Sequence, residues 1–314
     1  MAPRKIIIDT DPGGDDAVAI LLALASPAEL TVLGLTAVAG NVPLAQSERN
    51  ARAICELAAR PETPVYAGCG RPLSREPLAA RSVLGATGLG RLILPEPQIR
   101  PQKAHAVDFL VEALFENDPG TVTLCALGPL TNVAMALVKE PLIAERIQEL
   151  VIMGGAYFAQ GNQSPVAEFN ILSDPHAAKI VLESGAEITM MPLDVTHKAL
   201  GTPERIERFR RLGNRCGAAI AELLSLAAER ANGRFAGKGS PLHDPCVMAY
   251  LLRPDLFRGR RVNVSVETKS ALSLGMTVVD WWSVTGRPPN ALWMAEIEAD
   301  LLYDLLVEHA SRLP

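Results

Sequence analysis

The stretch that decides the fold is KIIIDTDPGGDDAVAILLAL, which occupies residues 5–24. It opens with the apolar run Ile6–Ile8, turns at a Pro-Gly-Gly segment (12–14), and continues as an apolar helical stretch, Asp15–Ala25. A short apolar run bounded by turn residues is typical of a buried strand, and proline and glycine allow a sharp change of direction. The stretch therefore predicts a strand, a tight turn and a helix.

The same alternation continues along the chain. The strands that we expect are Ile6–Ile8, Leu30–Val38, Thr121–Ala126, Leu150–Met153, Glu187–Pro192, Val262–Glu267, Met276–Val279 and Leu292–Ile297. The helices that we expect are Asp15–Ala25, Pro43–Ala59, His105–Glu116, Thr131–Val138, Pro175–Glu183, a pair within Thr202–Arg230, His243–Leu252 and Leu301–Ser311. These strands lack clear polar alternation, which indicates that helices cover both of their faces.

This pattern predicts an α/β fold, with an open, mostly parallel, Rossmann-like sheet and helices on both faces. The extra helical segment within Thr202–Arg230 precedes the late motif His243-Asp244-Pro245. No linker interrupts the chain, so we expect a single domain over residues 1–314. Such sheets bind ligands beyond the carboxyl ends of their strands. The segments that follow strands, and so are expected to form the site, are 9–16, 38–41, 127–132, 154–170 and 194–197.

Composition limits the classes of function. The 314 residues carry a formal net charge of -5, which argues against a general nucleic-acid binder because such proteins usually present a basic face. No apolar run approaches the ~20 residues that a membrane span needs. The five cysteines are scattered and never spaced as CxxC, and Met1 leads directly into a strand without a signal peptide. We therefore expect a cytoplasmic protein with reduced thiols that binds neither nucleic acid nor membrane.

Four carboxylates lie close together in the first turn, those of Asp9, Asp11, Asp15 and Asp16. Capping explains one aspartate at a helix N-terminus, because its side chain accepts hydrogen bonds from free backbone amides. Several crowded carboxylates repel one another, and a hard divalent cation with oxygen ligands relieves that repulsion. The turn therefore predicts a metal site.

Two known patterns begin in this way. Asp9-Thr10-Asp11 is similar to the DxD opening of the haloacid-dehalogenase-type phosphatases, but Gly13 stands where that motif has Thr or Val. The longer stretch DTDPGGDDAVAILLAL (9–24) instead resembles the signature of the nucleoside hydrolases, of the inosine-uridine-preferring type. The further stretches that resemble this family, in the same order over nearly the whole chain, are AGN (39–41), ALGPLTN (126–132), MGGAY (153–157), VAEFN (166–170) and HDP (243–245).

The resemblance implies a calcium ion (Ca2+) as cofactor. Its protein ligands would be Asp11, Asp16, Asp244 and the backbone carbonyl of Leu127, and Asp9 would orient this cluster from behind. Waters and the ribose hydroxyls would complete a shell of about 6–8 oxygens.

The resemblance also implies catalytic roles. Asp15 would be the general base that takes a proton from a calcium-acidified water, and His243 would assist the departing base. The residues implied to bind the ribose are Asn41, Met153, Asn162, Glu168 and Asn170.

The activity implied is hydrolysis of the N-glycosidic bond of ribonucleosides to a free base and ribose. Two alternatives remain, a metal-dependent phosphatase acting on a sugar phosphate and a nucleoside-binding sensor that has lost catalysis. The presence of Asp15 argues against the sensor, because binding alone does not require a general base. Relatives form dimers or tetramers, which implies a homo-oligomer.

Several residues allow either a structural or a functional interpretation. Asp244-Pro245 and Asp174-Pro175 both have the form of a helix N-cap followed by proline. We assign capping to Asp174 and metal binding to Asp244, a distinction that rests on the resemblance. His176 and His197 are interpreted as structural, and His243 is expected to have the near-neutral pKa that suits an acid catalyst.

Two departures from the family concern the base pocket. Leu84 stands where many relatives have a histidine, and Phe235 is the one aromatic residue between Ala221 and Leu242, where relatives often present tyrosines. The residues that we expect to form this wall are Ala227, Glu229, Arg230, Asn232 and Arg234. The base therefore stays open between a pyrimidine, a purine and a modified base.

Overall fold

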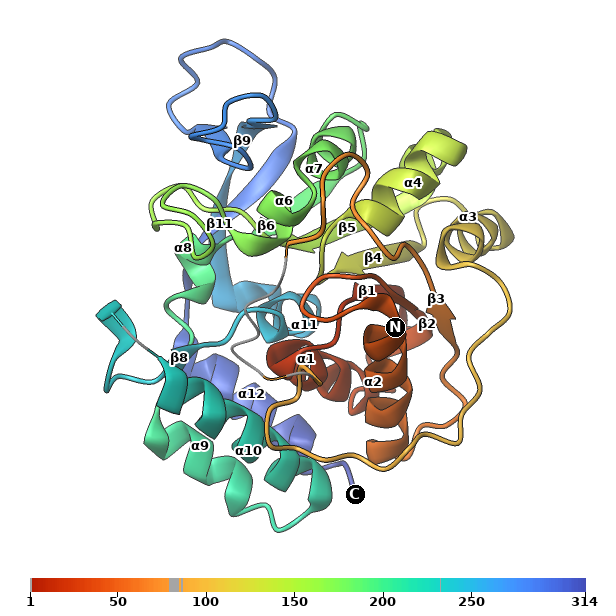
Figure 1. Cartoon of the computed structure of the whole chain (residues 1–314), viewed down its shortest axis with the longest axis vertical. Helices are drawn as coiled ribbons and strands as arrows, with labels where there is room; N and C mark the ends of the chain where they lie inside the picture. The colour runs from red at the N-terminus through yellow and green to blue at the C-terminus, as the bar shows by residue number, and fades with distance from the viewer. Residues whose placement is uncertain (1, 79–84, 86, 232) are drawn as a thin grey trace.

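The computed structural model describes residues 2–78, 85, 87–231 and 233–314. Within these residues, nine strands form one open sheet in the order β10-β9-β11-β6-β5-β4-β1-β2-β3 (Figure 1). From β3 across to β11 every neighbouring pair is parallel, whereas β9 is antiparallel to both β11 and β10. The strands of this sheet are β1 (Arg4–Thr10), β2 (Leu30–Ala37), β3 (Val65–Ala67), β4 (Val122–Ala126), β5 (Ile147–Met153), β6 (Ile188–Met191), β9 (Phe257–Val266), β10 (Thr277–Asp280) and β11 (Ala291–Ile297).

Helices connect these strands, and two short strands pair separately. The helices are α1 (Gly14–Leu24), α2 (Leu44–Leu57), α3 (Ala106–Glu116), α4 (Thr131–Lys139), α5 (Ile143–Arg146), α6 (Phe169–Ser173), α7 (Pro175–Leu182), α8 (Leu193–Thr196), α9 (Pro203–Arg210), α10 (Arg215–Arg230), α11 (Pro245–Leu252) and α12 (Ala299–Ala310). Single 3-10 turns occupy Gly233–Phe235 and Pro254–Leu256. Strands β7 (Leu200–Gly201) and β8 (Ser240–Pro241) form an antiparallel pair.

The order of the strands places the topological switch point of the sheet at the end of β1. The chain builds β1, β2 and β3 toward one edge, and then returns to place β4, β5 and β6 on the other side of β1. At such a reversal the connections from neighbouring strands run to opposite faces, and ligands bind beyond their carboxyl ends. Because β1 ends at Thr10, the acidic turn that follows it lies at this point.

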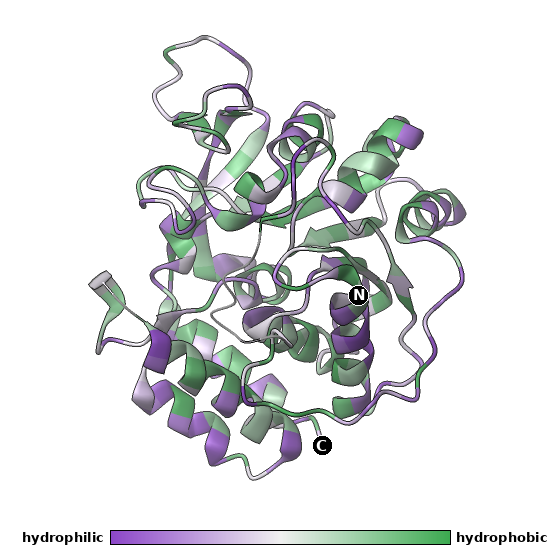
Figure 2. Ribbon diagram, viewed as in Figure 1, coloured by the Kyte–Doolittle hydropathy of each residue, from purple (hydrophilic) through white to green (hydrophobic). Residues whose placement is uncertain are grey.

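Helices cover both faces of the sheet because successive side chains of a strand point to opposite sides. Ile6 and Ile8 pack in a core with residues of α1, α2, α10, α11 and α12, whereas Ile7 packs with residues of α3, α4 and α7. The colouring by hydropathy in Figure 2 shows α2, α9 and α10 with both hydrophobic and hydrophilic parts, as amphipathic covering helices require.

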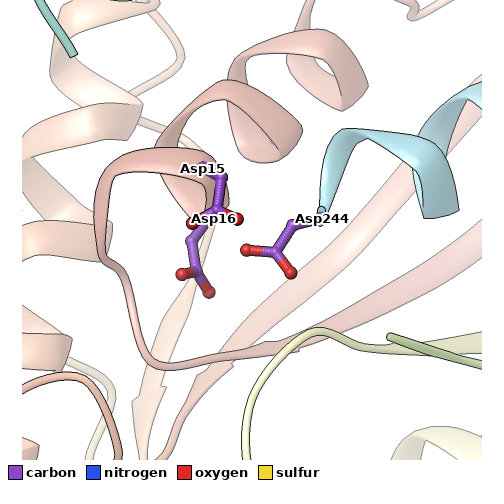
Figure 3. A group of neighbouring side chains, drawn as sticks. All are labelled: Asp15, Asp16 and Asp244. Atoms are coloured by element: carbon purple, nitrogen blue, oxygen red, sulfur yellow. The ribbon is translucent and has the colours of Figure 1, made fainter. Parts of the chain in front are cut away.

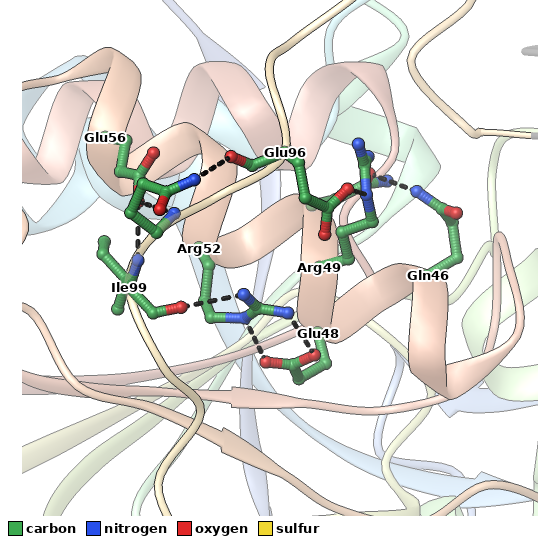
Figure 4. A network of polar contacts seen from close by, with 9 residues as sticks. Gln46, Glu48, Arg49, Arg52, Glu56, Glu96 and Ile99 are labelled. Carbon is green, nitrogen blue, oxygen red and sulfur yellow. Dashed lines mark hydrogen bonds and ion pairs between the residues drawn. The ribbon is translucent and has the colours of Figure 1, made fainter.

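The polar face of α2 forms ion pairs and hydrogen bonds with the chain segment around Ile99 (Figure 4). Arg49 Nε lies 2.7 Å from a carboxylate oxygen of Glu96, and Arg52 donates to the Ile99 carbonyl at 2.8 Å. The carboxylate of Glu56 accepts the Ile99 amide at 2.7 Å. Ion pairs and backbone hydrogen bonds thus hold an extended segment that has no strand partner.

A buried asparagine on α2 reaches toward the site. Asn50 Nδ2 donates to the carbonyl of Pro12, in the acidic turn, at 2.9 Å and to the carbonyl of Thr87 at 2.7 Å. Asn50 is fully buried, so these bonds satisfy both of its amide donors without water. The helix therefore couples the acidic turn to the segment around Thr87.

The predicted α/β fold, with a mostly parallel sheet and helices on both faces, is confirmed. Strand β9 begins at Phe257, not at the expected Val262, because the charged run Arg258–Arg261 lies inside the strand with its side chains exposed. Helix α11 begins at Pro245, two residues later than expected. The elements β3, α6 and α8 were not expected, since segments of five residues or fewer carry no periodic signal. In the described ranges every helix is too short or too polar to span a bilayer.

Candidate active site

Three carboxylates from distant parts of the sequence meet at the end of β1 (Figure 3). Asp15 and Asp16 belong to the first turn of α1, and Asp244 immediately precedes α11. Each of the three offers an oxygen within 4.8 Å of the others. The structure therefore brings the first turn and the HDP motif together, as expected from the sequence.

Local hydrogen bonds hold Asp16 in place. Its Oδ1 accepts the Thr10 hydroxyl at 2.6 Å, and its Oδ2 accepts the amide of Gly13, the N-cap residue of α1, at 3.0 Å. Asn41 Nδ2 also donates to Oδ2, at 3.2 Å. Capping thus accounts for part of the role of Asp16, but it does not explain why Asp11, Asp15 and Asp244 lie beside it.

Asp11 is fully buried, and glycines on neighbouring loops make room for it. Its Oδ2 accepts the amide of Asn41 at 2.5 Å, whereas its Oδ1 has no hydrogen-bond partner. A Cβ on Gly40 would lie 2.1 Å from Oδ2, and a Cβ on Gly128 would lie 2.6 Å from Oδ1. Only residues without a side chain fit around this carboxylate at these two positions.

Asp9 lies behind this group and is fixed by two neighbours. Its Oδ2 accepts the Thr36 hydroxyl at 2.6 Å and Asn132 Nδ2 at 2.7 Å. Sequence reasoning quoted Asn132 within the stretch 126–132 but gave it no role. Within the part of the chain that the structure describes, Asp9 Oδ1 and Asp11 Oδ1 are the buried side-chain oxygens without a hydrogen-bond partner.

Burial and mutual repulsion raise the pKa values of these carboxyl groups. Desolvation, followed by the charge of Asp16, holds the pKa of Asp11 well above its usual range. Desolvation and then the charges of Asp15, Asp16 and Asp11 do the same to the pKa of Asp244. Desolvation raises the pKa of Asp9 to about 7, although its two hydrogen bonds oppose the rise. Such a cluster stays charged at neutral pH when a cation offsets the desolvation and repulsion.

Asp15 differs from the other carboxylates because it is partly exposed. Desolvation still raises its pKa, and backbone hydrogen bonding from His243 and Asp244 opposes that rise. A raised pKa moves a carboxylate toward the strength that a general base needs near neutral pH.

The two Asp-Pro dipeptides differ as expected. Asp174 Oδ1 accepts the amide of Ala177 at 3.1 Å, so Asp174 caps α7. Asp244 occupies the same position before α11, but its side chain makes no capping hydrogen bond. Its carboxylate is directed toward Asp15 and Asp16 instead (Figure 3). The capping prediction for Asp174 is confirmed.

Three of the residues implied to bind ribose, Met153, Glu168 and Asn170, lie around the ends of β4 and β5. Asn170 Nδ2 donates to the carbonyl of Leu127 at 2.6 Å and to that of Met153 at 3.1 Å. The buried carboxylate of Glu168 accepts the amides of Asn170 and Ile171, capping α6, and desolvation raises its pKa to about 7. The Leu127 carbonyl, an expected metal ligand, therefore accepts the Asn170 side chain in this structure.

Asn162 lies farther out than the other residues of this group. It is exposed, and its Oδ1 accepts the amide of Phe169 at 2.9 Å. The structure thus assigns it a contact within the loop that follows β5.

Asp194 anchors the same loop. Its Oδ1 accepts the amides of Tyr157 and Ala159 at 3.1 and 2.7 Å, and its Oδ2 accepts Trp293 Nε1 at 2.8 Å. Asp194 therefore links the loop to α8 and β11 in the protein interior.

His243 lies beside the carboxylates in a desolvated position. Its Nδ1 is 2.8 Å from the hydroxyl of Thr196, and its ring centroid is 5.8 Å from that of His197. Desolvation lowers the pKa of His243 to about 4, so the expectation of a near-neutral pKa is wrong. At neutral pH its imidazole is uncharged and has one N–H donor.

His176 and His197 lie in different environments, one exposed and one beside Phe235. His176 is exposed, and its Nδ1 lies 2.7 Å from the Ser74 hydroxyl. The ring of His197 lies 5.0 Å from that of Phe235 and borders a cavity of about 450 Å³. Of the wall residues, Glu229 forms an ion pair with Arg91, 2.6 Å apart. Leu84 and Asn232 lie outside the described residues.

The amino-acid sequence is similar to that of known nucleoside hydrolases along nearly its whole length. Residues 6–304 match the family described as inosine-uridine preferring nucleoside hydrolase. The pyrimidine-specific ribonucleoside hydrolase RihA of Salmonella gallinarum is 45% identical over 304 residues, which are 96% of this chain and 97% of that protein. An uncharacterized protein of Schizosaccharomyces pombe is 48% identical and covers 99% of this chain, over its own full length.

Solved structures show the same likeness. A plant nucleoside hydrolase superposes with a TM-score of 0.92 at 33% identity, covering 98% of this chain and 99% of that chain. A purine-preferring ribonucleoside hydrolase from Gardnerella vaginalis has a TM-score of 0.91 at 30% identity, covering 98% of both chains. The chain therefore belongs to the inosine-uridine preferring nucleoside hydrolase family and is a ribonucleoside hydrolase.

Proposed function

We propose that this hydrolase cleaves the N-glycosidic bond of pyrimidine ribonucleosides at a calcium site, giving a free base and ribose. The observation that carries the proposal is the group formed by Asp15, Asp16 and Asp244 at the switch point of the sheet. Family membership favours this reaction over the two alternatives, a sugar-phosphate phosphatase and a catalytically silent nucleoside sensor.

The donors in this region suit calcium. They are all oxygens, as this hard cation prefers, and the partnerless Oδ1 of Asp11 lies buried among them. The residues that would hold the ion are Asp11, Asp16, Asp244 and the carbonyl of Leu127, once the Asn170 side chain releases that carbonyl. When bound, the cation supplies positive charge that acidifies a water and balances the carboxylates.

The chain's own residues then carry the reaction. Asp15 accepts a proton from the water as the water oxygen bonds to C1′ of the ribose. The bond between C1′ and the base nitrogen breaks, its electron pair leaves with the base, and the base takes up a proton. The carboxylates favour the positive charge that develops on the sugar, as in glycoside hydrolysis.

Other residues would position the two ends of the substrate. We propose that the residues holding the ribose hydroxyls are Asn41, Asn162, Glu168 and Asn170, with Met153 packed against the sugar, since fixed reactants lose less entropy on the way to the transition state. Asp9 would orient Asp11 from behind. His243 would face the leaving base, where its uncharged imidazole acts as a hydrogen-bond donor.

The preference for pyrimidines rests on relatives that are named pyrimidine-specific ribonucleoside hydrolase RihA, at about 45% identity. The purine-preferring Gardnerella vaginalis enzyme is more distant, at 30%. We also propose a cytoplasmic homo-oligomer, a dimer or tetramer. The location is supported by the five cysteines, all within the described residues, none of which forms a disulfide.

The proposal is tested by incubating the purified protein with calcium and a panel of purine, pyrimidine and modified ribonucleosides, and measuring free ribose. We expect release from uridine and cytidine first, and a loss of at least about a hundredfold in Asp15→Asn. Asp118→Asn, an exposed aspartate away from the site, is the matched control. If calcium binds and no nucleoside yields ribose, the proposed reaction is wrong, and release from purines alone would reject the base preference.

A further inference from the structure

The segment that follows β6 contains a buried hydroxyl group that faces the site. Thr196 is the last residue of α8 and is fully buried. Its Oγ1 lies 2.8 Å from Nδ1 of His243, whose chain position is 47 residues away. The segment 194–197 follows a strand and is therefore expected to lie at the site, yet Thr196 has no role in the reaction proposed above.

The direction of this hydrogen bond decides which nitrogen of His243 carries the proton. A neutral imidazole has one N–H and one bare nitrogen, and a hydroxyl can either donate or accept. The hydroxyl proton of Thr196 needs an acceptor, because a buried donor without a partner is costly. Among the described residues, His243 Nδ1 is the one hydrogen-bond partner that its Oγ1 has.

Thr196 therefore donates, and Nδ1 of His243 accepts. In the opposite arrangement Nδ1–H would donate to Oγ1, and the hydroxyl proton would be buried without an acceptor. Donation by Thr196 leaves Nδ1 bare, so the ring proton of His243 lies on Nε2. Nε2 is on the far side of the ring from Nδ1 and so is turned away from the Thr196 hydroxyl.

We propose that Thr196 is a positioning residue, which holds His243 in the Nε2–H tautomer so that this N–H donates a hydrogen bond to the departing base. The inference rests on the proposed function, because it assumes that His243 faces the leaving group. A base that leaves with the electron pair of the broken bond becomes a better acceptor as the bond stretches. The wrong tautomer would present a lone pair to that developing negative charge and oppose it.

The first test compares two leaving groups in two variants. Thr196→Val keeps the shape of the side chain and removes the hydroxyl, whereas Thr196→Ser keeps the hydroxyl. We expect Thr196→Val to lower kcat on uridine by a factor at least about ten times larger than the factor for 4-nitrophenyl riboside. The phenolate of that second substrate departs without help from the protein. Thr196→Ser should restore most of the activity on uridine. Equal losses on both substrates would show a general structural role and overturn the inference.

A double-mutant cycle tests whether Thr196 acts through His243. If it does, adding Thr196→Val to His243→Ala lowers kcat on uridine no further, since the group that it orients is already absent. Additive losses would overturn the inference. Thermal melting of all variants, measured in parallel, checks that each is folded.

A direct readout does not depend on activity. Nitrogen NMR of protein labelled in its histidine rings distinguishes Nε2–H from Nδ1–H, and we expect His243 to be Nε2–H in the wild type and mixed in Thr196→Val. An Nδ1–H signal in a wild-type enzyme that cleaves uridine would reject the inference and leave the proposed function intact. A wild type that cleaves neither substrate would reject the proposed function, and the role of Thr196 with it.

Discussion

Asp174 and Asp244 both precede a proline at the start of a helix, yet their carboxylates contact different groups. Asp174 accepts the amides of Ala177 and Leu73 and the hydroxyl of Thr131. Asp244 has no capping bond and faces other carboxylates. A cap stabilises the fold, whereas a carboxylate held among like charges destabilises it until a cation arrives.

This difference predicts opposite effects of two substitutions. Asp174→Ala should lower the free energy of unfolding by about 1–3 kcal/mol and leave calcium affinity nearly unchanged, because it removes a cap and leaves donors unpaired. Asp244→Asn should raise the Tm of the metal-free protein and weaken calcium binding at least about tenfold. Thermal melts with EDTA or calcium, and calorimetric titration with calcium, measure both. Equal calcium affinities for Asp244→Asn and the wild type would contradict the assignment.

The glycines around Asp11 lead to a second prediction at this scale. Gly128→Ala places a Cβ 2.6 Å from Asp11 Oδ1, and Gly40→Ala places one 2.1 Å from Oδ2. Either methyl group must displace the carboxylate, so calcium affinity should fall about 10–100-fold. Gly70→Ala is the matched control, because its nearest neighbour, Leu44, is 3.7 Å away. A titration in which all three variants bind calcium alike would show that the position of Asp11 does not matter.

The sequence revealed the site's carboxylates but not their supports. Asp9, Asp11, Asp15 and Asp16 are visible because they crowd one turn. The supporting residues Asn132, Asn50 and Thr196 lie in helices, and the contacts that give each a role join segments far apart in the sequence. The local sequence pattern around these residues does not predict such long-range hydrogen bonds. The pKa of His243 also escaped prediction, since it depends on how deeply the folded chain buries the ring.

At the scale of elements, the strand-helix alternation was predictable where segments were long and apolar. Strand β9 is an exception, because the charged residues in its first half are typical of a segment that flanks a strand. Arg260 lies over the rings of Trp281 and Trp282, at 5.6 and 6.0 Å, so partners beyond the sheet explain why an arginine-rich segment stays in a strand. Those partners come from a later part of the chain, which no local window includes.

Asp194 anchors two backbone amides of the loop between β5 and α6. Asn at this position has one acceptor oxygen and one amide group, so it cannot accept both the amides of Tyr157 and Ala159 and the indole N–H of Trp293. We expect Asp194→Asn to lose about 1–3 kcal/mol of stability. Because the loop leads to Asn162 and Glu168, KM for nucleosides should rise while calcium affinity stays nearly constant. Melting, kinetics and titration test this, and an unchanged Tm and KM would show that the loop holds without the anchor.

The stability of the whole molecule should depend on pH because of its buried carboxyl groups. The pKa of Asp9 is about 7 in the metal-free fold against 3.8 as the ordinary value, and those of Asp11, Asp15, Asp16 and Asp244 are also raised. A folded state with raised carboxyl pKa values binds protons that the unfolded chain releases. Its stability is therefore complete below about pH 3.8 and is lost as pH rises toward 7.

In EDTA we expect the free energy of unfolding to fall between pH 4 and 7, by roughly 4 kcal/mol for a carboxyl group shifted as far as Asp9. Calcium competes with protons for these oxygens, so the stabilisation that it provides should increase over the same range. Denaturant unfolding at several pH values, with EDTA or calcium, measures both trends. A calcium effect that is independent of pH would mean that the ion binds elsewhere.

The position of Asp244 also has a consequence for biosynthesis. The acidic turn is synthesised well before Asp244, which completes the group of three carboxylates that Asp15 and Asp16 begin. Until then the turn lacks a complete set of ligands, and a prematurely terminated product that stops before residue 244 never acquires one. Cation binding at the proposed site would thus mark molecules whose translation has passed this point.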